Sequence, residues 1–322
     1  MSDGLPWVEK YRPETLESVA GNEGIIETIR QFIKQGQLPH LLFYGPPGTG
    51  KTSTIIAIAK EIFGKSYRNM ILELNASDDR GIDVVREQIK TFASTRQMFG
   101  GNSQQFKLIV LDEADSMTNV AQNALRRIIE KYSQHTRFCI LANYTHKLNP
   151  ALISRCTRFR FQPIGDAATK EFLEKVIAAE NVNITEEALN DLIKLSKGDM
   201  RRNLNVLQAC HARAGGPIEP SDIYECVGSP DPKDIELVVY SLMNDDWSQC
   251  LPLISNMKQE KGLALADMLT MIGDIMVNVE LDEKKRAKIL TGLSDIEYRL
   301  SSGGSEKIQT SGMIGVVRSA LD

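Results

Sequence analysis

The residues best suited to chemistry form a glycine-rich stretch at positions 45–52, Gly-Pro-Pro-Gly-Thr-Gly-Lys-Thr. The stretch matches the phosphate-binding loop pattern, in which one glycine and four free positions precede Gly-Lys-Ser/Thr. Its glycines allow the backbone to turn tightly, so that successive N–H groups can point at phosphate oxygens. We expect Lys51 to reach the β- and γ-phosphates and the Thr52 hydroxyl to ligate Mg²⁺. The predicted nucleotide-binding residues of this stretch are Gly45, Pro46, Pro47, Gly48, Thr49, Gly50, Lys51, Thr52 and Ser53.

The segments on either side of this loop support the same interpretation. The apolar run 41–44 precedes the loop, and an apolar helical pattern at 55–62 follows it. A buried strand that leads through the loop into a buried helix is the context that this motif requires. The helix N-terminus adds about half a positive charge beside the phosphates. A plain glycine-rich turn would need neither neighbour, so the sequence predicts a nucleotide-binding protein.

Two adjacent carboxylates, Asp112 and Glu113, follow the apolar run 108–111, which is typical of a buried strand. Ligands of an open parallel sheet bind beyond the carboxyl ends of its strands, where the loop at 45–52 also lies. Asp112 is expected to hold Mg²⁺, directly or through water. Glu113, pointing the other way along the strand, is expected to orient and deprotonate a water for attack on the γ-phosphate. A carboxylate base and the absence of an Asn-Lys-x-Asp motif separate this site from regulatory GTPases that position water with Gln.

Three further polar residues follow or flank predicted strands. Asn143 follows an apolar strand and is either a turn-forming residue or a sensor that bonds both the γ-phosphate and the attacking water. Asn75, at the end of another strand, could hydrogen-bond Glu113 in an idle state. Arg155 lies in a Ser-Arg-Cys triplet before the last strand. On its own, this arginine says little, because a lone arginine is usually a solvated side chain.

The composition limits the class of protein. The 322 residues are enough for two or three domains, and 42% hydrophobic with 25% charged residues is ordinary for a soluble chain. Five scattered cysteines, never spaced as C-x-x-C, argue against a disulfide framework or a zinc site and favour a reducing compartment. The N-terminus lacks the apolar core of a signal peptide and no later run is long enough to cross a membrane, so no membrane partner is expected. A net charge of −4 means that any DNA contact must come from a local patch.

The order of apolar patterns predicts the fold class, α/β plus all-α. Apolar runs alternate with helical patterns up to about residue 162, which indicates a parallel sheet covered on both faces. Beyond residue 166 the patterns are helical, with a linker at 228–232 and amphipathic helices without strand signals from 233 to 322. The predicted domains are therefore a nucleotide-binding α/β domain at 1–164, a helical domain at 165–229 and a second helical domain at 230–322. The segment 5–13 is expected to be irregular because of its prolines.

An ordered set of motifs resembles the small subunits of replication factor C, the eukaryotic sliding-clamp loader of the AAA+ family. The motifs are Val8-Glu9-Lys10-Tyr11-Arg12-Pro13, the loop at 45–52, Leu74-Asn75-Ala76-Ser77-Asp78-Asp79-Arg80-Gly81, Asp112-Glu113-Ala114-Asp115, Ser154-Arg155-Cys156 and Gly198-Asp199-Met200-Arg201-Arg202. The similarity covers essentially the whole chain. The Ser-Arg-Cys and Tyr-Arg-Pro motifs are far more selective than the nucleotide-binding loop.

This resemblance implies a role for each matched residue and a name for each domain. The chain would consist of an AAA+ ATPase domain, a helical lid and a C-terminal helical collar that serves oligomerisation. Asn143 would be the first sensor of the γ-phosphate, and Arg201, on the lid, the second. Arg155 would be an arginine finger that acts in trans on the neighbouring subunit's ATP. The residues implied to line the adenine pocket are Val8, Tyr11, Arg12 and Pro13.

The helical pattern at 82–92 is a candidate DNA contact. Ile82, Arg86 and Lys90 fall on one face, with Arg80 just upstream, so that this face could follow a phosphate backbone. Neighbouring Asp and Glu residues cancel this charge locally, and from the residues alone a merely solvated face is nearly as plausible. The resemblance favours DNA, because clamp loaders line the interior of a spiral with this helix. Arg126 and Arg127, on a later helix, are alternatively suited to a subunit interface.

The resemblance also implies cofactors, partners and a cellular location. The chain would bind ATP and Mg²⁺ within a heteropentamer of replication factor C subunits. The complex would open a sliding clamp of the PCNA type and place it on primer–template DNA in the nucleus. A DNA-motor AAA+ protein of the branch-migration type is the first alternative, and the lack of a winged-helix pattern after the lid disfavours it. A non-catalytic scaffold is the second, and intact Lys51, Asp112 and Glu113 argue against it.

Overall fold

The computed structural model describes residues 4–76, 82–94, 106–213 and 215–321, with side chains in helix α5 described from residue 87 onward. The chain divides into two compact units. The first comprises Met1–Asn183 with Leu189–Gln208, and the second comprises Ile184–Ala188 with Ala209–Asp322. Each unit has its own apolar core.

The first unit is built on a parallel five-stranded sheet. Its strands are β1 (Leu41–Tyr44), β2 (Ile71–Asn75), β3 (Lys107–Asp112), β4 (Thr136–Ala142) and β5 (Thr157–Arg160). Their order in space is β2-β3-β4-β1-β5, and all neighbouring pairs are parallel. Because parallel strands all end at the same edge, the residues that follow β1, β3 and β4 meet there. The predicted parallel α/β sheet is confirmed.

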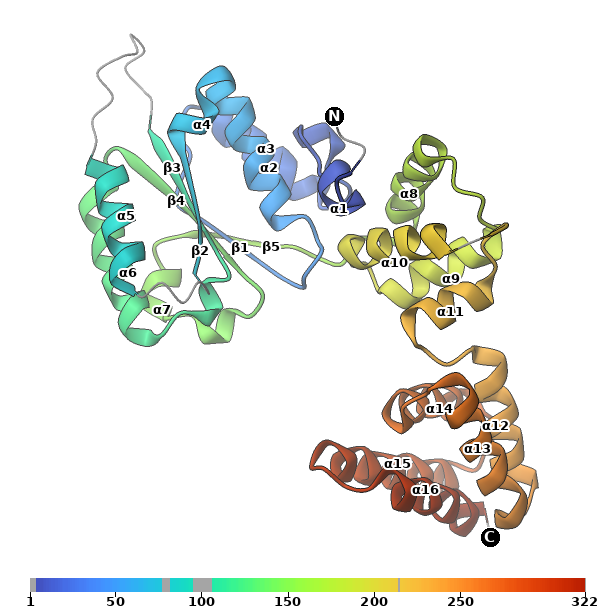
Figure 1. Cartoon of the computed structure of the whole chain (residues 1–322). Helices are drawn as coiled ribbons and strands as arrows, with labels where there is room; N and C mark the ends of the chain where they lie inside the picture. Colours follow the sequence, from blue (N-terminus) through green and yellow to red (C-terminus); the bar gives the residue numbers. More distant parts are fainter. Residues whose placement is uncertain (1–3, 77–81, 95–105, 214, 322) are drawn as a thin grey trace. The chain divides into compact units, whose positions relative to one another are not determined.

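Helices cover both faces of this sheet (Figure 1). Helices α2 (Glu23–Lys34) and α3 (Lys51–Phe63) pack on the face that includes Leu41 and Phe43. Helices α5 (Ile82–Ser94) and α6 (Asn119–Tyr132) pack on the other face, which includes Leu42. Side chains of a strand alternate between the two faces, and both faces are covered here. This arrangement explains why the strands are continuous apolar runs.

Short helical elements join the strands and long helices of this unit. The α-helical ones are α1 (Trp7–Lys10), α4 (Tyr67–Met70) and α7 (Pro150–Ile153), and the 3-10 helices are η1 (Leu16–Ser18), η2 (Gly64–Ser66), η3 (Ala114–Ser116) and η4 (Thr145–Lys147).

The N-terminal segment corrects one expectation. Residues 5–13 are not wholly irregular, because α1 forms a helical turn in which Glu9 and Lys10 donate backbone hydrogen bonds to the Pro6 carbonyl. A proline restricts the residue before it but fits the start of a helix, where its missing N–H is not needed. Pro13 lies after the helix has ended and so does not disturb it.

Three longer helices follow the sheet: α8 (Asp166–Glu180), α9 (Glu186–Ser196) and α10 (Met200–Arg213). Two of these helices begin at a side chain that caps the first turn. The Thr185 hydroxyl accepts a hydrogen bond from the Ala188 N–H at 3.3 Å, and the Asp199 carboxylate accepts one from the Arg202 N–H at 3.1 Å. Gly198, between α9 and α10, has a φ of 80°, which favours glycine.

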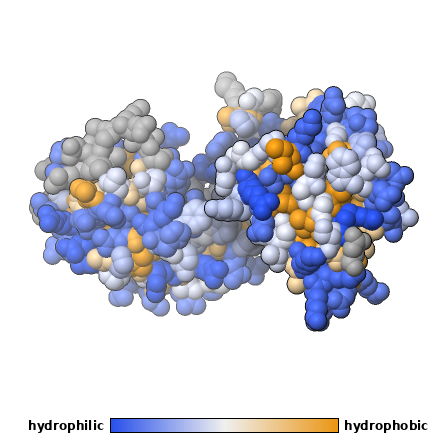
Figure 2. Space-filling view, turned by 90° about the horizontal axis from the view of Figure 1, so that it is seen from below, coloured by the Kyte–Doolittle hydropathy of each residue, from blue (hydrophilic) through white to orange (hydrophobic). Residues whose placement is uncertain are grey.

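The second unit is helical, as predicted for the C-terminal part of the chain. It contains α11 (Pro220–Val227), α12 (Pro232–Asn244), α13 (Trp247–Lys261), α14 (Leu265–Asn278), α15 (Glu283–Ser301) and α16 (Glu306–Leu321). Helices α12 to α16 enclose one apolar core. Large apolar side chains also reach the surface of these helices: Leu237, Tyr240, Trp247, Val277, Tyr298 and Ile308. Figure 2 shows orange, hydrophobic patches among blue, hydrophilic ones on one face of the molecule.

Within the described ranges, no helix is both long and apolar enough to cross a membrane. The same ranges hold no group of three or more His, Cys, Asp or Glu side chains placed to bind a metal ion together.

Candidate nucleotide-binding site

A cleft in the first unit brings together most of the residues singled out in the sequence. Its lining comes from the N-terminal segment, the glycine-rich loop, the ends of β3 and β4, and helices α8 and α10. The lining residues predicted from the sequence are Val8, Tyr11, Arg12, Pro13, Pro47, Gly48, Thr49, Gly50, Lys51, Thr52, Ser53, Asp112, Glu113, Asn143 and Arg201. Segments more than a hundred residues apart in the chain therefore form one site.

Two positions of the loop must be glycine, because a Cβ atom at either would collide with a neighbouring residue. Gly45 has a φ of 146°, and a Cβ atom there would lie 2.2 Å from the Phe161 carbonyl oxygen. Gly48 has a φ of 67°, and a Cβ atom there would lie 1.7 Å from the Asp199 Oδ1 atom. The Met200 N–H also donates to the Gly48 carbonyl at 3.2 Å. The N-terminus of α10 is thus packed directly against the phosphate-binding loop.

Lys51 is buried and its ammonium group is satisfied within the site. The Nζ atom donates to the carbonyl oxygens of Gly45 at 2.8 Å and Pro46 at 2.7 Å, and to the Asn143 Oδ1 atom at 3.0 Å. Burial lowers its pKa to about 8, although the carboxylate of Asp112 opposes this shift. Bound phosphates would place a full negative charge beside the ammonium group and so favour its protonated form.

Thr52 and Asp112 supply the oxygen ligands that Mg²⁺ prefers. The Thr52 hydroxyl, in the first turn of α3, donates to the Asp112 Oδ2 atom at 2.9 Å, and the second carboxylate oxygen accepts from the Glu113 N–H at 2.8 Å. A magnesium ion in a nucleotide site takes one or two protein oxygens and completes its shell with phosphates and water. The pair Thr52 and Asp112 fits that requirement.

Glu113 lies off the strand, which corrects the expectation that it would continue β3. Strand β3 ends at Asp112, and Glu113 adopts left-handed backbone angles, φ 53° and ψ 38°. Its carbonyl accepts hydrogen bonds from the N–H at 2.9 Å and the hydroxyl at 2.7 Å of Ser116, which hold the turn. A non-glycine residue in this conformation is uncommon and costs energy, which is a feature of functional sites. The turn leaves the Glu113 side chain exposed in the cleft.

The two asparagines lie at the ends of β2 and β4, the strands on either side of β3. Asn143 directly follows β4, and its contact with Lys51 places it between the loop and the acidic pair. The next residue, Tyr144, donates its N–H to the Asp115 carboxylate at 3.2 Å, which ties the end of β4 to the turn after Glu113. Asn75 pairs in register with Asp112, at the end of β2. The hydrogen bond suggested between Asn75 and Glu113 stays a prediction.

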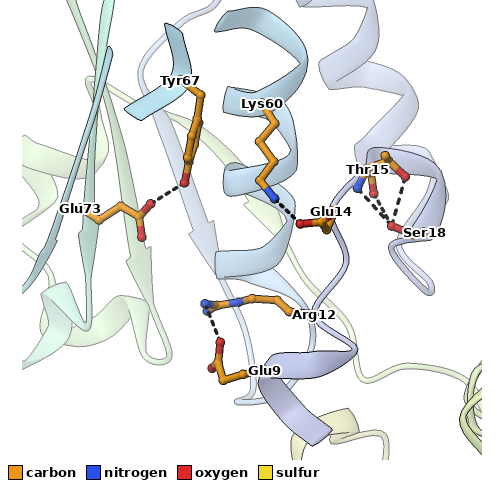
Figure 3. Close-up of polar contacts among 8 residues, drawn as sticks. All are labelled: Glu9, Arg12, Glu14, Thr15, Ser18, Lys60, Tyr67 and Glu73. Carbon is orange, nitrogen blue, oxygen red and sulfur yellow. Dashed lines mark hydrogen bonds and ion pairs between the residues drawn. The ribbon is translucent and has the colours of Figure 1, made fainter. Parts of the chain in front are cut away.

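The N-terminal segment forms one wall of the cleft. Besides Val8, Tyr11, Arg12 and Pro13, the lining includes the apolar residues Val19, Ala20, Ile164, Phe172 and Leu204. Figure 3 shows how this segment is held: Arg12 pairs with Glu9 at 3.3 Å, and Glu14 pairs with Lys60 of α3 at 3.0 Å. Apolar lining residues suit a purine ring better than they suit phosphate.

Sequence reasoning missed Glu180, the last residue of α8. Its Oε1 atom accepts hydrogen bonds from Lys10 Nζ at 2.6 Å and from the Tyr11 hydroxyl. Together with burial, this carboxylate raises the pKa of Tyr11 to about 12, so the phenol stays protonated. No local sequence pattern predicts such a contact, because the partners are about 170 positions apart in the chain.

Arg201 and Arg155 occupy different places. Arg201, in the first turn of α10, lines the cleft, and its charge contributes to the low pKa of Lys51. Arg155 is not among the described residues that line the cleft. Its guanidinium donates to the Ala151 carbonyl at 2.6 Å and forms an ion pair with Glu130 of α6. The roles of both arginines stay predictions.

The predicted DNA contacts lie largely outside the described side chains. Arg80 is outside the described residues, and Ile82 and Arg86 are described only as backbone of α5. Lys90 pairs with Glu87 at 3.0 Å on the helix surface, while Ile89 is buried against the sheet. Ile89 therefore lies on the face of α5 that packs on the sheet, and the DNA-binding face stays a prediction.

Comparisons with known proteins decide the family. Three family models match the chain: an ATPase family associated with various cellular activities (AAA) at residues 41–164, an RCF1/5-like AAA+ ATPase lid domain at 171–212, and the replication factor C C-terminal domain at 230–316. The chain is 62% identical to replication factor C subunit 3 of Blastobotrys adeninivorans, over 99% of this chain and 94% of that protein. The chain belongs to the replication factor C family.

Other relatives extend the same likeness. Replication factor C subunit 3 of Saccharomyces cerevisiae is 56% identical over 99% of this chain and 95% of its own length. Human replication factor C subunit 5 is 49% identical over 99% of this chain and 93% of its own length. The family resemblance inferred from the motifs is confirmed, and the chain carries the AAA ATPase domain of an enzyme.

A solved structure shares the fold at low sequence identity. The RuvB Holliday junction branch migration motor of Thermotoga maritima aligns over 82% of this chain and 91% of its own, with a TM-score of 0.54 and 16% identity. At this identity the likeness shows the AAA+ fold alone.

Proposed function

We propose that this chain binds ATP and Mg²⁺ in the cleft and hydrolyses the ATP as one subunit of a heteropentameric clamp loader. Its partners would be other replication factor C subunits, a sliding clamp of the PCNA type and primer–template DNA, and it would act in the nucleus. The observation that carries the proposal is the convergence of Lys51, the Thr52–Asp112 pair, Glu113 and Asn143 in one cleft. Membership of the replication factor C family supports the multi-subunit context.

The geometry supports a specific division of work within the cleft. Lys51 would exchange its carbonyl partners for phosphate oxygens, while the backbone N–H groups of the loop hold the rest of the triphosphate. Thr52 and Asp112 would hold Mg²⁺, which supplies neutralisation of phosphate charge when bound. Glu113 would orient a water and take its proton. Asn143, already bonded to Lys51, would hold the γ-phosphate and this water in position.

Two arginines would complete the chemistry. Arg201 would reach the γ-phosphate from the lid helix α10, whose N-terminus already contacts the loop. Arg155, which is absent from the described lining of its own cleft, would act on the ATP of a neighbouring subunit. An arginine placed on the transferring phosphate accelerates comparable reactions by about 10³- to 10⁵-fold. ATP would thereby favour the assembled complex, and hydrolysis would release the clamp.

The proposed function also assigns a role to each predicted domain. We propose an ATPase domain at 1–164, a lid at 165–229 and an oligomerisation collar at 230–322. The exposed apolar residues of α12 to α16 are suited to packing against other subunits. DNA would be contacted through α5, with Arg80, Ile82, Arg86 and Lys90.

ATP turnover by the complex that contains this chain tests the proposal. We expect primed DNA and clamp together to stimulate turnover more than either does alone. Stimulation by DNA without any effect of clamp would favour the motor alternative. No stimulation by either would contradict clamp loading and leave only a general AAA+ ATPase.

A further inference from the structure

The wall of the cleft formed by the N-terminal segment is attached to the lid helices by polar contacts. Glu180 of α8 accepts hydrogen bonds from Lys10 at 2.6 Å and from the Tyr11 hydroxyl. The Trp7 N–H donates to the Gln208 Oε1 atom of α10 at 3.0 Å. The side chains of Lys10 and Glu180 are only 27% and 17% exposed, so water screens this ion pair less than a surface pair. The segment is therefore held at its start by α10 and at its centre by α8.

Tyr11 is both attached to Glu180 and part of the cleft lining. The attached residues Trp7 and Lys10 are next in the chain to the lining residues Val8 and Tyr11. Besides this segment the lining includes the apolar residues Val19, Ile164 and Phe172, whereas Lys51 and Thr52 define the phosphate end. A nucleotide whose phosphates lie at the loop would thus place its base against the N-terminal segment. Glu180 itself is not among the described lining residues.

We propose that Glu180 is a positioning residue for the nucleotide base: by holding Lys10 and Tyr11, it fixes the wall against which the base packs. The inference rests on the proposed function of the cleft as an ATP site. It assigns to α8 a part in nucleotide affinity that acts through Tyr11 rather than through direct contact. Without the Glu180 carboxylate, part of the free energy of nucleotide binding would be used to order the N-terminal segment, which would weaken the affinity.

Binding of ATP and of tripolyphosphate to the full chain separates the two ends of the cleft. Isothermal titration calorimetry would compare the wild-type chain with Glu180→Ala, Glu180→Gln and Tyr11→Phe. Glu174→Ala is the matched control, because Glu174 is an exposed carboxylate on the same helix. We expect Glu180→Ala to weaken ATP binding by about tenfold, the effect of losing charge-assisted hydrogen bonds, and to leave tripolyphosphate binding within about twofold.

The conservative variants test whether the effect passes through Tyr11. Glu180→Gln keeps an acceptor for the Tyr11 hydroxyl and is expected to recover part of the ATP affinity. Tyr11→Phe should weaken ATP binding, and combining it with Glu180→Ala should cost less than the sum of the two single changes, because they remove one shared contact. If Glu180→Ala fails to fold, Tyr11→Phe alone decides the question by the same ratio of ATP to tripolyphosphate affinity.

Several outcomes would overturn the inference. Unchanged ATP affinity in Glu180→Ala and Tyr11→Phe would do so, as would an equal loss of ATP and tripolyphosphate binding. Equal affinity of the wild-type chain for ATP and tripolyphosphate would show that the base contributes nothing at this wall. A wild-type chain that binds neither ligand would instead contradict the proposed function of the cleft, which keeps the two failures distinct.

Discussion

Lys51 shows how a single side chain is prepared for phosphate. Its ammonium group is bonded to two loop carbonyls and to Asn143, and burial holds its pKa near 8. Carbonyl and amide oxygens are neutral acceptors, so they solvate the charge without fixing it as a carboxylate partner would. An arriving phosphate can replace them and gains a full charge interaction.

This state predicts a pH dependence of nucleotide binding. Below pH 8 the free chain carries a protonated Lys51, and above pH 8 that lysine becomes neutral. Bound phosphate raises its pKa, so binding above pH 8 must take up a proton, and ATP affinity should fall by up to about tenfold per pH unit. Calorimetric measurement of ATP affinity between pH 7 and 9.5 checks this. In Lys51→Met the overall affinity should be lower and this slope should disappear; an equal slope in that variant would contradict the assignment.

Arg155 gives a second prediction at the scale of residues. Arg155→Ala in this chain should leave its own ATP affinity nearly unchanged, because the residue is not part of the described lining of the cleft. Hydrolysis in the neighbouring subunit should fall by a factor of about 10³ or more. Single-turnover hydrolysis by the complex, with ATP affinity of the isolated chain as the control, checks both parts. Collapse of this chain's own ATP binding would mean that Arg155 acts in cis.

Residue types and spacing predicted that Lys51, Thr52 and Asp112 come together, and these residues lie in one cleft because their motif fixes a strand, a loop and a helix in order. Their roles towards phosphate and Mg²⁺ stay predictions. The left-handed turn at Glu113 was not predicted, since a non-glycine residue rarely adopts it. Glu180 was not predicted either, because its contacts depend on tertiary packing.

At the scale of elements, the half-buried side chain of His40 joins the start of β1 to β4 and α6. His40, just before β1, accepts a hydrogen bond at Nδ1 from the Phe138 N–H of β4 at 3.2 Å. Its Nε2 atom lies 3.2 Å from the Ser133 hydroxyl, and that hydroxyl donates to the Ile129 carbonyl at the end of α6. The ring must therefore donate from Nε2 and accept at Nδ1, which requires neutral imidazole.

This geometry predicts how stability changes with pH. Burial, with a smaller contribution from Arg137, lowers the pKa of His40 to about 4, whereas an unfolded chain would protonate it near 6.5. The unfolded state then binds more protons between these values, so the contribution of His40 is complete above about pH 6.5 and is lost as the pH falls towards 4. At pH 5 the loss should be on the order of 1 to 2 kcal/mol. Urea unfolding at pH 5 and 7 of the wild-type chain and of His40→Gln checks this, and an equal pH dependence in both would contradict it.

Most elements could be predicted, and the exceptions have local causes. The continuous apolar runs identified the strands because both sheet faces are covered. Helix α1 was not predicted because prolines disfavour a helix at the residues before them, yet the residues between Pro6 and Pro13 are enough for one helical turn. For Arg86 of α5, the helical pattern predicts which residues share its face, and its side chain lies outside the described ones.

At the scale of the whole molecule, the chain combines a nucleotide site with a separate helical unit. The AAA, lid and replication factor C models match successive segments, and the first unit contains every described residue that lines the cleft. Composition and motif order predicted the family and the fold. The domain limits at 164 and 229 stay a prediction. Helices α9 and α10 each contribute to both compact units.

The central claim is that ATP held in this cleft is hydrolysed by this chain. The most direct measurement is DNA- and clamp-stimulated ATP turnover by a complex in which only this chain carries Glu113→Gln, with ATP binding measured in parallel. The substitution keeps the size of the side chain and removes the base, so binding should persist while turnover falls and clamp loading slows. Turnover and loading equal to those of the wild-type complex would contradict the account and favour a scaffold subunit.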